Sequence, residues 1–149
     1  MDAEKLWESW EKINRILRLK HHEVAKKYGL TLEQFHLLIE LDELKLEMVS
    51  DEFIPPTIGE IAIDIGNAPH TLSEKIKRLE KKGLVKKVRD ETDQRKNRVT
   101  FTEKGKNLIN NIKKEVSKTF IEKTNTIDDE NLKNLLKGLN ELNEKLSNN

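Results

Sequence analysis

The stretch TIGEIAIDIGNAPHTLSEKIKRLEKKG, residues 57–83, decides the fold of this 149-residue chain. It opens with a Thr-x-x-Glu capping box, which predicts the start of a helix, and Gly66 ends that helix. Pro69 begins a second short helix, because proline is well tolerated in a first helical turn, and Gly83 ends it. Two short helices separated by a few residues that include a glycine are the sequence pattern of a helix-turn-helix.

Each of these helices has one apolar face, and a β-hairpin follows them. The apolar residues at helical spacing are Ile58, Ile61, Ala62 and Ile65, then Leu72, Ile76 and Leu79. Residues 84–88 and 98–102 predict two strands around a charged turn at residues 89–96, with Val99 and Phe101 on one strand face. A hairpin in this position is a wing, so we expect residues 31–102 to form a winged helix-turn-helix domain.

Longer helices flank this unit. We expect one over residues 3–28, one that starts at a capping box of Thr31 and Gln34, one from Glu103 and one over about residues 128–146. The inner face of the second holds Phe35, Leu38 and Leu41, and one face of the third holds Leu108, Ile112, Val116 and Phe120. Residues 48–56 contain two adjacent prolines and are predicted to be a loop. The expected fold class is mainly α with a small β-hairpin wing.

The first and last helices carry long apolar stripes. Their members are Leu6, Trp10, Ile13 and Leu17, and Leu132, Leu135, Leu139 and Leu142. One interpretation is that these stripes only complete the core of a monomer. We favour dimerisation, because helices at the ends of a highly charged chain rarely keep such stripes without a partner. Residues 1–30 and 103–149 are accordingly predicted to form a helical dimerisation region.

Composition excludes several classes of protein. The chain has no cysteine, so it has no disulfide framework, thiolate zinc site or cysteine redox switch. No apolar run approaches the roughly 18 residues of a membrane span. We expect a soluble, cytoplasmic protein with no membrane partner and no cofactor.

Charge is unevenly distributed along the chain. Residues 66–106 hold 13 Lys and Arg against 6 Asp and Glu, a net charge of +7, whereas the rest of the chain has a net charge of −6. A compact basic segment within an acidic protein is typical of a polyanion-binding surface. The alternative is a solvated helix face rich in lysine.

Two runs of residues resemble the MarR family of transcriptional regulators. The first runs from Asp93-Gln94-Arg95 to Thr102-Glu103-Lys104-Gly105 and is similar to the family's wing signature. The second, residues 78–85, is similar to the family's recognition-helix exit, and the order of helices matches from about Leu6 to Leu146. The resemblance implies a homodimeric winged-helix regulator, a repressor that binds a near-palindromic operator in double-stranded DNA and is released by a small-molecule effector. Such proteins usually have a serine cap where this chain has Ala68, and Asn67 is the alternative cap.

The second helix of the helix-turn-helix is the predicted recognition helix. Short polar side chains reach base edges and basic side chains reach phosphates. The candidates for base edges are His70, Thr71, Ser73 and Glu74, and those for phosphates are Lys75, Lys77 and Arg78. The alternative for His70 is a solvated residue, and for Glu74 we favour an ion pair with Arg78, four residues later.

Arg95 is the predicted minor-groove residue of the wing, because negative potential is concentrated in that groove. Asp93 is expected to orient an arginine or brace the turn, since a carboxylate that faces DNA is repelled. A surface salt bridge of little energetic value is the alternative. Further wing candidates are Arg89, Lys96, Asn97 and Arg98.

The sequence disfavours two other classes of function. An enzyme or metal site on His21, His22 and His36 is disfavoured because their spacing matches no ligand motif. A winged-helix interaction module that does not bind DNA is disfavoured because the chain has a basic recognition helix and a wing arginine. The sequence therefore predicts a non-enzymatic DNA-binding regulator with no metal.

Overall fold

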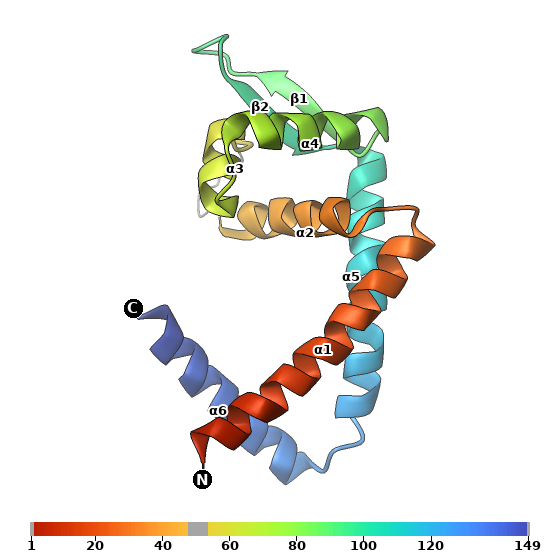
Figure 1. The fold of residues 1–149 in the computed structure, drawn as a ribbon, viewed down its shortest axis with the longest axis vertical. Helices are drawn as coiled ribbons and strands as arrows, with labels where there is room; N and C mark the ends of the chain where they lie inside the picture. The colour runs from red at the N-terminus through yellow and green to blue at the C-terminus, as the bar shows by residue number, and fades with distance from the viewer. Residues whose placement is uncertain (1, 48–53, 149) are drawn as a thin grey trace. The chain divides into compact units, whose positions relative to one another are not determined.

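A computed structural model describes residues 2–47 and 54–148. The elements in chain order are α1 (Ala3–Lys27), α2 (Leu32–Glu47), α3 (Ile58–Ile65), α4 (Pro69–Lys81), β1 (Val85–Arg89), β2 (Asn97–Phe101), α5 (Glu103–Thr124) and α6 (Asp129–Ser147) (Figure 1). This order confirms the mainly helical fold with a β-hairpin wing. Most of the predicted loop at residues 48–56 lies outside the described residues.

The chain divides into two compact units, Met1–Lys113 and Lys114–Asn149, and α5 crosses the boundary between them. The first unit contains the helix-turn-helix and the hairpin, and α4 lies between α2 and the hairpin (Figure 1). The predicted division into a winged domain at residues 31–102 and a dimerisation region stays a prediction. None of the helices in the described ranges combines the length and hydropathy that crossing a bilayer demands.

The helix-turn-helix is built around a closed apolar core. Its fully buried members include Phe35, Leu38, Ile61, Leu72, Ile76 and Leu79. Burying a side chain of this size contributes about 1.5–3 kcal/mol each, so these residues fix how α2, α3 and α4 pack. Ile58 and Ile65, predicted to face inward, are only half-buried.

Both predicted capping boxes are present. The Thr57 hydroxyl accepts a hydrogen bond from the Glu60 N–H at 3.1 Å, and the Glu60 carboxylate accepts one from the Thr57 N–H at 3.1 Å. Thr31 and Gln34 form the same pair of bonds at the start of α2. Each box satisfies backbone N–H groups that have no partner within their own helix.

The turn between α3 and α4 depends on Gly66, whose φ of 75° lies in the left-handed region that favours glycine. The cap of α4 is Ala68, which makes no side-chain cap hydrogen bond. Asn67 is therefore not the cap: its N–H donates to the Ala62 carbonyl at 3.0 Å and belongs to the end of α3. Pro69 begins α4, as predicted.

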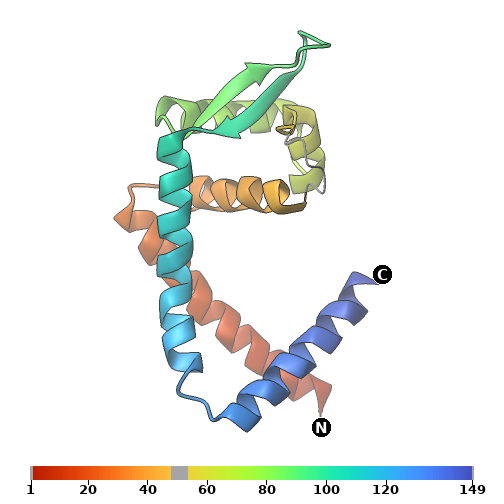
Figure 2. The same ribbon diagram turned by 180° about the vertical axis from the view of Figure 1, so that it is seen from behind.

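The hairpin is antiparallel, with Val85 opposite Phe101 and Arg89 opposite Asn97. Its first strand begins one residue later than predicted, and its second begins and ends one residue earlier. Thr102, which was predicted to end the second strand, instead caps α5 by accepting a hydrogen bond from the Gly105 N–H at 3.0 Å. Figure 2 shows the turn of the hairpin extending away from the helices of its unit.

Few residues of the two C-terminal helices are buried. Within α5 the buried residues are Gly105, Ile109 and Ile112, whereas Leu108 and Val116 are half-buried and Phe120 is 50% exposed. Of the predicted apolar face from Leu108 to Phe120, only Ile112 is buried, because the core of the first unit covers only the first part of α5. Helix α6 begins at its cap Asp128 and has no buried residue.

Candidate nucleic-acid interface

The outer face of α4 is polar and open. His70, Thr71, Glu74 and Lys77 are exposed, on the side of α4 away from its buried stripe, and Ser73 is half-buried. Lys81, which sequence reasoning left out, is also exposed and lies one turn after Lys77 on the same face. The spacing of four residues from Lys77 is the signal that would have found it.

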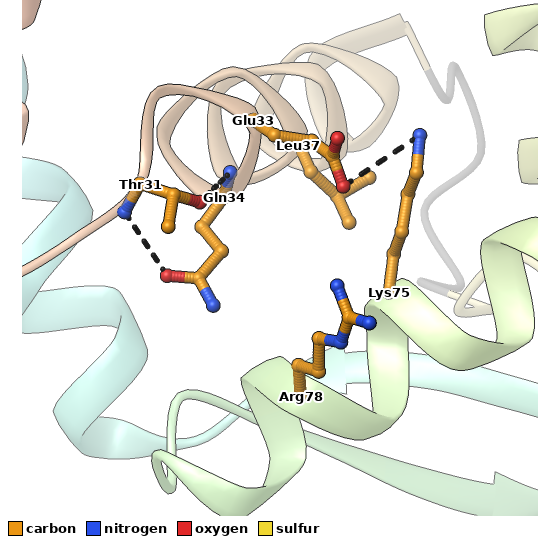
Figure 3. Close-up of a pocket in the computed structure, with 6 residues that line it drawn as sticks. All are labelled: Thr31, Glu33, Gln34, Leu37, Lys75 and Arg78. Carbon is orange, nitrogen blue, oxygen red and sulfur yellow. Dashed lines mark hydrogen bonds and ion pairs between the residues drawn. The ribbon is translucent and has the colours of Figure 1, made fainter.

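Two predicted phosphate contacts lie on the side of α4 toward α2, and of these Arg78 is exposed. Lys75 extends toward α2, where its Nζ lies 3.9 Å from a Glu33 carboxylate oxygen, and its side chain is only 23% exposed. Arg78 points from α4 toward the same helix and lines a pocket of about 40 Å³ (Figure 3). The remaining residues that line this pocket are Thr31, Gln34 and Leu37.

The predicted ion pair between Glu74 and Arg78 is wrong. Both residues lie in the described part of α4, and no salt bridge joins them there, since the Arg78 side chain is directed toward α2 (Figure 3). Glu74 therefore stands exposed on the outer face, without the arginine that was expected to neutralise it.

The turn of the wing presents Arg95 to solvent. One Asp93 carboxylate oxygen accepts hydrogen bonds from the Arg95 backbone N–H at 3.1 Å and from its Nε at 3.2 Å. The Arg95 side chain is nevertheless 91% exposed. These bonds from Arg95 hold the pKa of Asp93 below its ordinary value, so the carboxylate stays charged. Asp93 thus both orients the guanidinium and braces the turn.

Arg98 is turned into the base of the wing. Its Nε donates to Asp90 at 2.8 Å and its Nη1 donates to the Pro55 carbonyl at 2.6 Å. Asp90 also accepts from the Thr92 hydroxyl at 2.7 Å and from the Asp93 N–H at 3.0 Å. Hydrogen bonds from Thr92 and then Arg98 lower the pKa of Asp90 strongly.

Sequence reasoning missed Asp90 and placed Arg98 among the DNA contacts. The signal for Asp90 was available, because an aspartate that opens a turn commonly accepts hydrogen bonds from the residues two and three positions later. The other wing candidates, Arg89, Lys96 and Asn97, are exposed. Their roles stay predictions.

Comparison with known proteins identifies the family. A family model described as transcriptional regulator SarA/Rot matches residues 19–112. The HTH-type transcriptional regulator SarZ of Staphylococcus epidermidis is 32% identical over 122 residues, which cover 80% of this chain and 74% of SarZ. The chain belongs to the SarA/Rot family of transcriptional regulators.

Solved structures support the same fold for this SarA/Rot regulator. A MarR family protein from Bacillus stearothermophilus has a TM-score of 0.75 and 23% identity, over 99% of each chain. A point mutant of MepR from S. aureus, bound to an oligodeoxyribonucleotide, has a TM-score of 0.67 and 18% identity, over 98% of this chain and 99% of that one. The fold is that of MarR-type winged-helix regulators, which confirms the resemblance seen in the sequence.

Two histidines of this SarA/Rot regulator, His21 and His36, form a ring cluster with Phe35. The His21 ring lies 5.3 Å from that of Phe35 and 6.2 Å from that of His36, centroid to centroid. Burial lowers the pKa of His21, and the charges of His36 and His22 lower it further. Across the described ranges, no group of three or more metal-binding side chains comes together.

Proposed function

We propose that this regulator binds a near-palindromic operator in double-stranded DNA as a homodimer, acts in the cytoplasm, and represses the genes that the operator controls. In this proposal α4 enters the major groove, where His70, Thr71 and Ser73 read base edges. Arg95 enters the adjacent minor groove. Phosphates are contacted by Lys77 and Lys81 of α4 and by the exposed wing residues Arg89 and Lys96. The observation that carries the proposal is the 91% exposed Arg95 side chain, held by Asp93 at the tip of a wing beside an open polar helix face.

The dimer rests on a second observation. Exposed apolar side chains line both terminal helices: Leu6, Trp10 and Ile13 in α1, and Leu135, Leu139 and Leu142 in α6. The other two predicted stripe residues, Leu17 and Leu132, are half-buried. Apolar stripes of this length are typical of a surface that a partner covers. A second copy of the chain is the partner that a two-fold operator requires.

Release by a small-molecule effector belongs to the same proposal. The pocket between α2 and α4, at about 40 Å³, is much smaller than the roughly 300–1,000 Å³ of pockets that hold such molecules. We therefore propose an effector site elsewhere, formed when the dimer assembles. Dissociation of the operator complex by a panel of phenolic acids would test this part separately.

The test of DNA reading is selection of bound sequences from a random double-stranded pool, followed by affinity measurements at several salt concentrations. We expect two half-sites about one helical turn apart and an affinity that falls steeply between about 50 and 200 mM salt. A flat salt response, or a pool that never converges, would contradict the proposal.

Variants separate the helix from the wing. Arg95→Ala is expected to weaken binding and remove the preference for A·T-rich flanks while the half-site stays the same, because the arginine reads groove width. Thr71→Ala with Ser73→Ala is expected to blur the half-site, at about 1–3 kcal/mol for each lost base contact. Circular dichroism of each variant is the folding control, and a changed half-site in Arg95→Ala would show that the wing has been assigned wrongly.

A further inference from the structure

A two-stranded hairpin is only marginally stable alone, so the direction of a wing depends on what holds its base. Here the base is tied to the short segment that precedes α3. The Val99 N–H donates to the Pro56 carbonyl at 2.9 Å, and Arg98 pairs as an isolated β-bridge with Thr57. The second strand of the wing is therefore anchored to Pro56 and Thr57 by its backbone.

Side chains extend this anchor to the tip. Arg98 joins the Pro55 carbonyl to Asp90, which lies just after the end of β1. Asp90 accepts a hydrogen bond from the Asp93 N–H, and Asp93 in turn holds the Arg95 guanidinium. Four hydrogen-bonded links thus lead from the start of the helix-turn-helix to the exposed arginine.

We propose that Asp90 and Arg98 are positioning residues that set the direction of Arg95 toward the minor groove. This inference rests on the DNA-binding function proposed above and adds residues that do not touch DNA themselves. The side chains of Asp90 and Arg98 are only 13% and 21% exposed to solvent, and they form an ion pair with each other. Arg98 therefore acts through Arg95 and not as a phosphate contact.

The sign of the effect of Asp90→Asn distinguishes this role from simple electrostatics. Removing a negative charge from a DNA-binding wing should tighten binding if only charge matters. The positioning role predicts the reverse: roughly tenfold weaker binding, approaching that of Arg95→Ala, and a flatter flank preference. Combining Asp90→Asn with Arg95→Ala should give no further loss, because both changes remove the same contact.

Glu91→Gln is the matched control. Glu91 is the next residue in the turn, is exposed, and makes no hydrogen bond or ion pair among the described residues. Glu91→Gln removes one negative charge, as Asp90→Asn does, so we expect DNA binding to be unchanged or slightly tighter. If Asp90→Asn behaves like Glu91→Gln, the positioning role is overturned.

Arg98→Lys supplies a second, independent variant that keeps the positive charge. A lysine serves a phosphate contact well but lacks the planar fork that reaches both Asp90 and the Pro55 carbonyl. We expect Arg98→Lys to lose affinity and flank preference together, and wild-type behaviour would overturn the inference. Thermal melting of each variant shows whether the fold is retained.

The failure of the inference is distinguishable from the failure of the proposed function. If Arg95→Ala leaves the DNA affinity and the flank preference unchanged, the assignment of the wing is wrong and so is this inference. If Arg95→Ala weakens binding but Asp90→Asn and Arg98→Lys do not, only the inference is overturned.

Discussion

At the scale of single residues, Gly105 determines how closely α5 approaches the wing. A Cβ on this residue would overlap the Leu84 carbonyl, and the Gly105 N–H donates to Thr102, whose hydroxyl donates to the Gly83 carbonyl at 2.6 Å. We expect Gly105→Ala to lower the free energy of unfolding by about 1–3 kcal/mol or more, since backbone must move to admit the methyl group. Urea denaturation of the purified protein measures this change. Gly59→Ala is the control, because an added Cβ there meets only the Thr57 hydroxyl at an ordinary 3.9 Å. Equal losses in the two variants would show that the Gly105 contact is not tight.

At the scale of elements, the packing of α1 on α2 should depend on pH through His21. Burial and the neighbouring His36 and His22 lower its pKa from the ordinary value of 6.5, so the folded state holds His21 neutral more strongly than the unfolded state does. The unfolded chain then binds more protons, and stability rises with pH. The contribution of His21 is complete above pH 6.5 and is lost as the pH falls through the lowered pKa. We expect the melting temperature to decrease between pH 7.5 and 5.5, and to decrease less in His21→Gln. An identical pH dependence in wild type and His21→Gln would contradict the prediction.

At the scale of the whole molecule, the exposed stripes of α1 and α6 predict a dimer at micromolar concentration. Leu139 and Leu142 are 37% and 40% exposed in the single chain. A second copy can cover only this exposed fraction, so each side chain contributes roughly 0.5–1 kcal/mol to association. A dimer holds four such side chains, so Leu139→Lys with Leu142→Lys should raise the dimer Kd about 30-fold or more. Multi-angle light scattering over a dilution series measures this, and operator affinity should fall in parallel. Ile63→Lys makes the same kind of change on an 85% exposed residue of α3 and should leave the dimer intact. A wild-type protein that is monomeric at every concentration would contradict the dimer.

Much of this fold was predictable from the sequence because its signals are local. The capping boxes at Thr31 and Thr57, the glycine turn at Gly66 and the stripe of α4 each involve residues within a few positions of one another. Helical and strand periodicity therefore determined the order of elements and the places of the helix-turn-helix and the wing. The wing signature also pointed to Asp93 and Arg95, which are two residues apart and bonded to each other.

Only the tertiary structure decided which way several charged side chains turn. Lys75 lies beside Glu33, Arg98 donates a hydrogen bond to the Pro55 carbonyl, and Lys113 forms an ion pair with Asp42 at 2.7 Å. The two residues of each pair are far apart in the sequence. Periodicity shows that such a residue lies off the apolar stripe, but not which distant group the packed chain will place beside it. A basic residue in a DNA-binding segment therefore has the same sequence signature whether it faces phosphate or the protein. That choice was made by the packing of α2 and residues 55–57 against α4 and β2, which local sequence patterns do not encode.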